Sequence, residues 1–131
     1  MWFLTNMKIH ESTENYLETI YMLTLRGNPI RSIDIAKELG YSRPSVSVAM
    51  KKLRADGYIS TDESGFILLT ESGNSIAVTM HERHVILSQW LIGLGVDPKI
   101  AVNDACKIEH IMSEQSFNAI KEHISASKSH T

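Results

Sequence analysis

Gly40 separates two short amphipathic segments, and this arrangement restricts the possible folds more strongly than the composition does. The first segment, Ser32–Leu39, runs into a glycine that can adopt the left-handed conformation in which helices often end. The second opens at Ser42, a favourable N-cap residue, with Pro44 in the first helical turn, where the missing N–H is tolerated. Two short helices joined by a three- to four-residue turn containing glycine are typical of a helix-turn-helix. The sequence therefore predicts this motif over residues 32–54.

A change of period after Gly57 indicates a β-hairpin. Tyr58–Thr61 and Phe66–Leu69 have the composition of short strands, and Asp62–Gly65 between them is typical of a turn. A helix with apolar residues at a 3.6-residue period precedes the motif, and we expect it over about residues 12–25. The order helix, helix, helix, hairpin predicts a winged helix-turn-helix.

The rest of the chain is predicted to be helical. A long helix follows the hairpin and ends near Leu94. Asp97 and Pro98 suit the N-cap and first position of a second helix, and Ser113 opens a third, which we expect to end near Ile124. These helices carry more apolar surface than a lobe of roughly 45 residues can bury alone. A symmetric homodimer formed through this lobe is the economical solution.

These elements define the predicted architecture. It is mainly α with a small β-hairpin, and it combines an N-terminal winged helix-turn-helix with a C-terminal helical dimerisation lobe. We expect the winged helix-turn-helix domain over residues 8–75, the helical domain over residues 76–125, and a tail over residues 126–131. Of the 131 residues, 43% are hydrophobic, which is enough for a core and too much for a disordered chain.

Charge and cysteine content exclude several classes of protein. The chain has 13 Lys and Arg against 15 Asp and Glu, so with a net charge of −2 it is not a wholesale polyanion binder. The single cysteine, Cys106, excludes an internal disulfide and a multi-cysteine zinc module within one chain. No apolar run approaches the ~18 residues of a membrane span. Because Met1–Leu4 also lacks the pattern of a secretion signal, we expect a cytoplasmic protein without membrane contact.

The helix predicted over residues 42–54 has an apolar inner face and a positively charged outer face. It contains four cations and no acidic residue, in a chain of net charge −2. The residues that share the inner face at a 3.6-residue period are Val46, Ala49, Met50 and Leu53. The candidate DNA-binding residues are Ser42, Arg43, Pro44, Ser45, Ser47, Val48, Lys51 and Lys52.

Small outward residues near the start of this helix allow it to enter the major groove of double-stranded DNA closely. Ser45 and Ser47 can hydrogen-bond phosphates or base edges, Val48 can contact a thymine methyl, and the lysines can neutralise phosphates. The same face also fits an ordinary solvated helix, but the order of elements favours DNA binding. Asp62 and Glu63 in the hairpin turn repel phosphate, so we expect the wing to contribute little to affinity.

A second candidate site lies in the C-terminal lobe. Cys106, Glu109 and His110 are spaced at i, i+3 and i+4, which places all three on one helix face. A thiolate, a carboxylate and an imidazole that converge in this way can coordinate a transition metal. Further possible ligands are His84 on the preceding helix and, on the first helix, Glu18 with Asn15.

Each of these residues also has a structural interpretation. A lone buried cysteine often acts as a small hydrophobe, and His84 or Glu18 also fits an exposed helix position. A catalytic Cys–His pair is a third possibility. Two such residues on one helix leave no evident oxyanion site or orienting third group, so we do not expect an enzyme.

Several stretches are similar to one family of regulators. They are Thr13–Tyr21, Asp34–Ala36, Ser45–Ser47, Leu53–Tyr58, Leu69–Gly73, Arg83–His84 and Asn103–Ser113. Over about residues 8–124 the chain resembles the diphtheria-toxin repressor and manganese transport regulator (DtxR/MntR) family of metal-dependent transcriptional repressors. The order acid-Ala-Cys-x-x-Glu-His-x-Met-Ser in the last stretch is the most specific part of this resemblance.

The resemblance implies a homodimer of winged helices with a divalent metal corepressor bound between the first helix and the dimerisation lobe. The family's ligand positions fall on Asn15, Glu18, His84, Cys106, Glu109 and His110. Asn15 stands where the manganese branch has a carboxylate and the iron branch a methionine, Glu18 matches the manganese branch, and Cys106 matches the iron branch. Ser88 and Val102 stand at ancillary ligand positions of the iron branch, so we do not expect that second site. The length resembles the two-domain manganese branch.

The predicted function is that of a metal-dependent, DNA-binding transcriptional regulator that acts as a repressor. A divalent ion, Fe²⁺ or Mn²⁺, is expected to tie the DNA-reading domain to the dimer lobe and to set the two recognition helices about one DNA turn, ~34 Å, apart. Zn²⁺ or Co²⁺ can bind the same donors in vitro. Two alternatives stay open: a winged-helix dimer regulated without metal, by a small molecule or by Cys106 oxidation, and a metalloenzyme that uses the Cys/His/Glu cluster.

Overall fold

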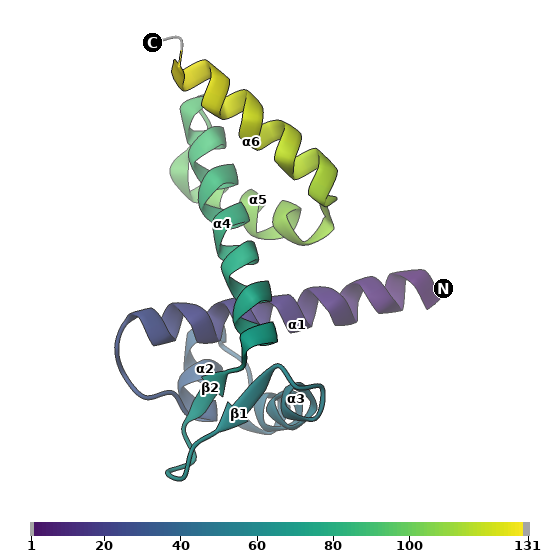
Figure 1. Cartoon of the computed structure of the whole chain (residues 1–131), viewed down its shortest axis with the longest axis vertical. Helices are drawn as coiled ribbons and strands as arrows, with labels where there is room; N and C mark the ends of the chain where they lie inside the picture. Colours follow the sequence, from purple (N-terminus) through teal and green to yellow (C-terminus); the bar gives the residue numbers. More distant parts are fainter. Residues whose placement is uncertain (1, 130–131) are drawn as a thin grey trace. The chain divides into compact units, whose positions relative to one another are not determined.

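The computed structural model describes residues 2–129, with the side chains of residues 11–127. Its elements (Figure 1) are α1 (Trp2–Leu25), α2 (Ser32–Leu39), α3 (Arg43–Ala55), β1 (Ile59–Thr61), β2 (Ile67–Leu69), α4 (Glu71–Gly93), α5 (Pro98–Ile111) and α6 (Glu114–Ser129). The chain divides into two compact units, Met1–Thr79 and Met80–Thr131. The predicted fold class, mainly helical with one small antiparallel hairpin, is confirmed for the described residues. None of the described helices has the length and apolarity needed to cross a bilayer.

The helix-turn-helix forms between α2 and α3, as predicted. Gly40 ends α2 with φ of 70°, a left-handed conformation that a residue without Cβ adopts at little cost. Ser42 is the N-cap residue of α3, and its Oγ accepts a hydrogen bond from the backbone N–H of Ser45 at 3.3 Å. The inner face of α3 is buried at Val46, Met50 and Leu53.

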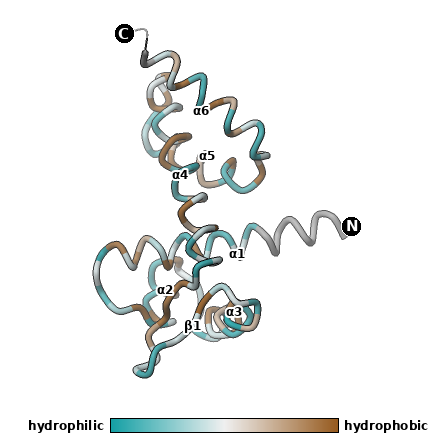
Figure 2. The backbone as a smooth tube through the Cα atoms, in the orientation of Figure 1, coloured by the Kyte–Doolittle hydropathy of each residue, from teal (hydrophilic) through white to brown (hydrophobic). Residues whose placement is uncertain are grey.

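The wing is a short antiparallel hairpin of β1 and β2. The Asp62 carboxylate accepts hydrogen bonds from the N–H groups of Ser64 and Phe66, both at 2.9 Å, and so closes the turn. Figure 2 shows that this turn is hydrophilic. The N–H of Ile67 donates to the carbonyl of Ile30 at 2.8 Å, which attaches the hairpin to the segment before α2.

The core of the first unit collects apolar side chains from the helices and both strands. The largest side chains that are fully buried are Leu17, Ile20, Ile35, Val46, Met50 and Ile59. Removing such side chains from water contributes about 1.5–3 kcal/mol each. This core buries one face of α3, so that the opposite face of the helix stays exposed.

Two helices are longer than the sequence predicted. We expected the first helix to begin near residue 12, but α1 runs from Trp2 to Leu25 without a break. Ser12 suits an N-cap but also tolerates a helix interior, and no glycine or proline interrupts residues 2–25. For the same reason α6 continues to Ser129, beyond the end expected near Ile124.

The second unit packs the C-terminal part of α4 with α5 and α6. Its buried centre consists of Leu87, Ala105 and Phe117, with Trp90, Ile108 and Ile120 packed around it. The predicted cap of α5 forms, because the Asp97 carboxylate accepts from the N–H of Lys99 at 3.1 Å. The Ser113 hydroxyl oxygen likewise accepts from the N–H of Ser116 at 3.1 Å and starts α6.

Candidate metal centre

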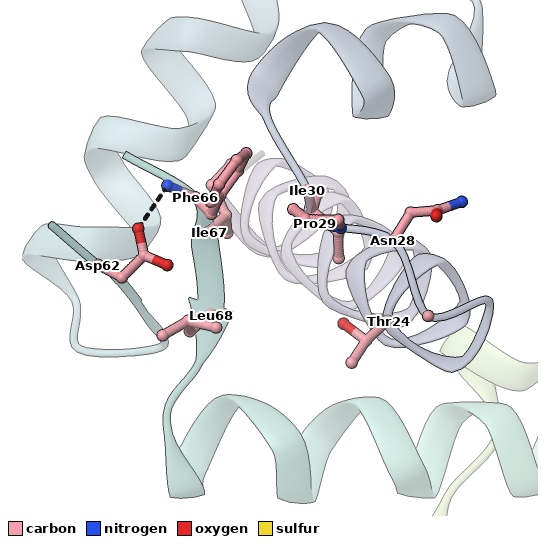
Figure 3. A pocket seen from close by; sticks show the side chains of 9 residues that line it. Thr24, Asn28, Pro29, Ile30, Asp62, Phe66, Ile67 and Leu68 are labelled. Carbon is pink, nitrogen blue, oxygen red and sulfur yellow. Dashed lines mark hydrogen bonds between the residues drawn. The ribbon is translucent and has the colours of Figure 1, made fainter. Parts of the chain in front are cut away.

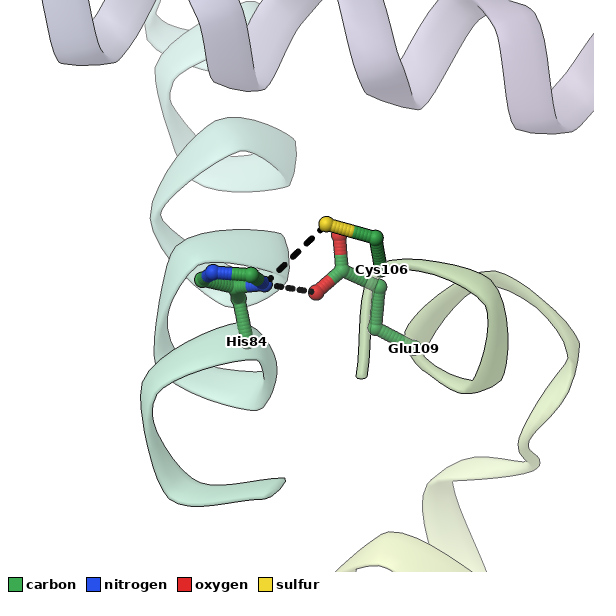
Figure 4. A group of neighbouring side chains, drawn as sticks. All are labelled: His84, Cys106 and Glu109. Atoms are coloured by element: carbon green, nitrogen blue, oxygen red, sulfur yellow. Dashed lines mark hydrogen bonds and ion pairs between the residues drawn. The ribbon is translucent and has the colours of Figure 1, made fainter. Parts of the chain in front are cut away.

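Three side chains of the kind that bind metals meet within the second unit. His84 lies on α4, and Cys106 and Glu109 lie on α5. The two α5 residues are three positions apart and therefore project from one face. Figure 4 shows the imidazole directed toward the thiol and the carboxylate. Leu87 of α4 and Ala105 of α5 belong to one buried cluster, which holds the two helices together.

The distances among the three groups suit a metal ion. His84 Nδ1 lies 3.1 Å from Glu109 Oε2 and 3.6 Å from Cys106 Sγ. One ligand atom from each residue lies within 4.8 Å of the other two. Nitrogen, sulfur and oxygen ligands bound at about 2.0–2.3 Å lie roughly 3–4 Å from one another. The side chains therefore fit a transition metal with small adjustments.

The Glu109 carboxylate is shared between two imidazoles. Its Oε1 lies 3.4 Å from His110 Nε2, while Oε2 faces His84. Glu109 is only 1% exposed, so its charge is removed from water and depends on close partners. Glu109 thus links His84 and His110 and is the centre of the cluster.

His84 favours its protonated form in this arrangement. Hydrogen bonds to Cys106 and to Glu109 raise the pKa of His84 to about 10, and partial burial opposes the rise only in part. The proton supplies positive charge where a divalent cation would supply it. Proton and metal therefore compete for His84 Nδ1.

The six predicted ligands are divided between the two units. Those of the second unit are His84, Cys106, Glu109 and His110. Asn15 and Glu18 lie three residues apart on α1, in the first unit. The geometry within the second unit is compatible with metal binding, and the ligand set as a whole stays a prediction.

Sequence reasoning missed Arg83 as a participant. This residue is 8% exposed, and its Nη1 donates to the carbonyls of Glu109 at 3.1 Å and Met112 at 2.7 Å. The helical period of α4 does not indicate that Arg83 faces the end of α5 rather than solvent. The available signals were its position directly before His84 and its place in a stretch similar to the regulator family.

The predicted DNA-reading residues are exposed on and beside α3. They are Ser42, Arg43, Pro44, Ser45, Ser47, Val48, Lys51 and Lys52. Val48 is 70% exposed, whereas Val46 is fully buried. Ser42 also has a structural role, because its Oγ caps α3 and donates to Ser45 Oγ at 2.8 Å. This face offers hydroxyls, an apolar side chain and cations, and its contact with DNA stays a prediction.

A shallow hollow of about 310 Å³ lies beside the wing, between the loop after α1 and β2 (Figure 3). Its lining residues are Thr24, Gly27, Asn28, Pro29, Ile30, Asp62, Phe66, Ile67 and Leu68. Its only carboxylate, Asp62, is engaged in the hairpin turn. The lining contains no histidine or cysteine, so this hollow is unsuited to the metal chemistry of the cluster.

Two adjoining parts of the chain match known domains. Residues 8–65 match the N-terminal DNA-binding domain of iron-dependent repressors, and residues 70–130 match their metal-binding and dimerisation domain. The chain belongs to the iron-dependent repressor family. The resemblance found in the sequence is thereby confirmed.

Known relatives match most of this chain. The transcriptional regulator MntR of Salmonella typhimurium is 35% identical over 109 residues, which cover 83% of this chain and 69% of that protein. The HTH-type transcriptional regulator MntR of Bacillus subtilis is 36% identical over 109 residues, covering 83% and 77%. The structure of the manganese regulator SloR gives a TM-score of 0.78 at 26% identity, covering 86% of this chain and 53% of that chain. The chain thus spans about half the length of SloR.

The matched domains agree with the placement of the candidate sites. The exposed face of α3 lies in the segment that matches the DNA-binding domain of iron-dependent repressors. The four clustered side chains of α4 and α5 lie in the segment that matches the metal-binding and dimerisation domain. The family consists of transcriptional regulators rather than enzymes, in agreement with the sequence prediction.

Proposed function

We propose that this protein is a metal-dependent transcriptional repressor that binds double-stranded operator DNA as a homodimer. The convergence of His84, Cys106 and Glu109 carries the proposal, because it lies in the segment that matches a metal-binding and dimerisation domain. The exposed basic face of α3 supplies the complementary DNA-reading surface. Because a regulator of this kind acts on chromosomal DNA, we propose that the protein is located in the cytoplasm.

The proposed site takes ligands from both units. They are Asn15 and Glu18 from α1, and His84, Cys106, Glu109 and His110 from α4 and α5. When bound, a divalent cation supplies positive charge that neutralises the Glu18 and Glu109 carboxylates and the Cys106 thiolate. Because α1 belongs to the same unit as α3, ligands on α1 couple the site to the position of the recognition helix. This coupling favours the arrangement in which two recognition helices lie about one DNA turn, ~34 Å, apart.

The donor set favours a divalent transition metal of intermediate character. The Cys106 thiolate prefers softer, later ions, whereas the carboxylates and the amide oxygen of Asn15 suit harder ones. We propose Fe²⁺ or Mn²⁺ as the cellular corepressor, and the description of SloR as a manganese regulator supports Mn²⁺. Zn²⁺ and Co²⁺ also bind thiolate and imidazole and serve as in vitro probes.

Metal-dependent DNA binding tests this function. Labelled duplexes are selected from a random library in Mn²⁺ or Fe²⁺, and their binding is then measured by fluorescence anisotropy with Mn²⁺, Fe²⁺, Zn²⁺ or a chelator. We expect tight binding of selected duplexes that the chelator reverses. Equal binding in chelator would contradict the proposal and favour a winged-helix dimer regulated without metal.

Glu18→Gln and Glu109→Gln test the contribution of each unit. Each substitution removes a negative charge at nearly constant size, so we expect metal-stimulated DNA binding to fall by at least about 10-fold while the dimer persists in sedimentation. Glu11→Gln, at an exposed position of α1, is the control and should respond like the wild type. If metal still stimulated DNA binding fully in Glu109→Gln, the proposed metal site would be wrong. If this were so only in Glu18→Gln, the ligands would all belong to the second unit.

A further inference from the structure

Arg83 is a buried cation beside the metal centre. It lies on α4, one residue before His84, and is 8% exposed. Its Nη1 donates hydrogen bonds to the backbone carbonyls of Glu109 at 3.1 Å and Met112 at 2.7 Å. Burial of a charge is costly unless the charged group is hydrogen-bonded. The two carbonyls therefore satisfy Nη1 of this buried side chain, whereas its Nε has no hydrogen-bond partner among the described residues.

The carbonyls that Arg83 contacts lie at the C-terminal end of α5. This helix ends at Ile111. The last carbonyls of a helix lack intrahelical N–H partners and lie at the negative end of its dipole. A guanidinium suits this place because it is permanently charged and presents several N–H donors in one plane. Arg83 thus caps α5 from a different helix.

Arg83 also contacts the beginning of α6. Its Cζ lies 5.2 Å from the centre of the Phe117 ring, within the range of a cation–π interaction. Phe117 is itself part of the buried centre of the second unit. One side chain therefore joins α4, the end of α5 and the start of α6.

We propose that Arg83 is a positioning residue for the metal centre, an inference that rests on the proposed metal-binding function. Glu109 is the residue whose carbonyl Arg83 contacts and whose carboxylate lies 3.1 Å from His84 Nδ1. His84 directly follows Arg83 on α4. The guanidinium therefore sets the separation of the two helices at the point where their ligands meet, and it holds the last turn of α5 in the orientation that aims Glu109 at His84.

Co²⁺ binding tests this role, because a bond between Cys106 and Co²⁺ produces a thiolate-to-metal charge-transfer absorption. Arg83→Met removes both carbonyl hydrogen bonds and keeps an extended side chain, whereas Arg83→Lys keeps a cation that can donate to the same carbonyls. We expect Co²⁺ affinity to fall by about 10–100-fold in Arg83→Met, with a weakened or displaced charge-transfer band. Arg83→Lys should recover part of the affinity and of the band.

Lys121→Met is the matched control. Lys121 forms an ion pair with Glu82, so its removal breaks a different connection between α6 and α4, next to Arg83 in the sequence. We expect the control to keep the wild-type Co²⁺ affinity and spectrum. Melting temperatures of all metal-free variants show how much each substitution destabilises the fold.

The outcomes separate positioning from general stabilisation. Wild-type Co²⁺ affinity and spectrum in Arg83→Met would overturn the proposal. The proposal would also fail if Lys121→Met lost as much Co²⁺ affinity as Arg83→Met and Arg83→Lys recovered none of it. Should Arg83→Met fail to fold, Arg83→Lys decides: weaker Co²⁺ binding than wild type supports positioning, and equal binding contradicts it. A wild-type protein that gave no charge-transfer band would instead refute the metal centre itself.

Discussion

The imidazole of His84 holds a proton that its neighbours stabilise. Hydrogen bonds to Cys106 and Glu109 raise the pKa of His84 from 6.5 to about 10. A group whose pKa rises on folding stabilises the folded state fully below its unfolded pKa, and this contribution is lost as the pH rises toward the folded value. His84→Gln should therefore lower the free energy of unfolding of the metal-free protein most near pH 6 and least near pH 10.

Urea unfolding in the presence of a chelator, followed by circular dichroism, measures this difference for His84→Gln. His123→Gln, at an exposed position of α6, is the control for the replacement of a histidine by glutamine. A destabilisation by His84→Gln that stayed constant, or that grew toward high pH, would show that Cys106 and Glu109 do not stabilise the imidazolium.

The spacing of Cys106, Glu109 and His110 could be interpreted from the sequence because the period of a helix is fixed. The contact of Arg83 with the Glu109 carbonyl could not, since it depends on how α4 packs against the end of α5. Asp62 shows a related limit. The sequence predicts Asp62 within the hairpin turn and as an acidic group that repels phosphate, but only the fold shows that its carboxylate closes the turn.

Among the elements, the start of α4 depends on one glycine. A Cβ atom on Gly73 would lie 2.0 Å from the carbonyl oxygen of Tyr58. Thr70 Oγ1 donates to the carbonyl of Gly57 at 2.7 Å and fixes the helix start on this same segment. Because backbone faces backbone here, we expect Gly73→Ala to lower the free energy of unfolding by about 1–3 kcal/mol, as measured by urea denaturation.

Gly93→Ala is the control for this substitution. A Cβ there would meet nothing within 4 Å, and the residue lies at the end of the same helix. We expect Gly93→Ala to be neutral or to stabilise the protein by up to about 1 kcal/mol, because alanine restricts the unfolded chain. Equal effects of the two substitutions would mean that the packing of α4 on Tyr58 is not tight.

The two faces of α3 allow a pair of substitutions to separate stability from DNA binding. Val46 is fully buried and Val48 is 70% exposed. Val46→Ala should lower the free energy of unfolding by about 1–3 kcal/mol, whereas Val48→Ala should change it by less than about 0.5 kcal/mol. In anisotropy measurements on a selected duplex, Val48→Ala should weaken metal-dependent binding. Unaltered DNA affinity in Val48→Ala would exclude this side chain from the interface.

Helix ends differed in how well the sequence predicted them. Gly40, Ser42 and Asp97 mark real helix ends because caps act through backbone groups only two to four residues away. The cap-like residues near Ser12 do not start a helix, since α1 simply continues through them. A cap residue therefore predicts a helix end only where the residues outside the helix cannot themselves be helical.

For the whole molecule, the exposed apolar surface of the second unit bears on assembly. Ile92, in the last turn of α4, is 41% exposed, Leu94, directly after this helix, is 65% exposed, and Ile100 at the start of α5 is 54% exposed. Both elements lie in the segment that matches a metal-binding and dimerisation domain. Because a large exposed apolar surface often marks a protein interface, we expect these side chains to lie in the homodimer contact.

Leu94→Glu tests this surface, because a symmetric contact would bring two copies of the new carboxylate into an apolar interface. We expect a monomer in analytical ultracentrifugation, whereas Leu25→Glu, at a 61% exposed position of α1 in the first unit, should remain dimeric. The Leu94→Glu monomer should still give the Co²⁺ charge-transfer band, since Cys106 and its partners belong to one chain. It should lose tight operator binding, because a single winged helix cannot engage two half-sites together. A dimeric Leu94→Glu with full DNA affinity would place the dimer contact elsewhere on the protein.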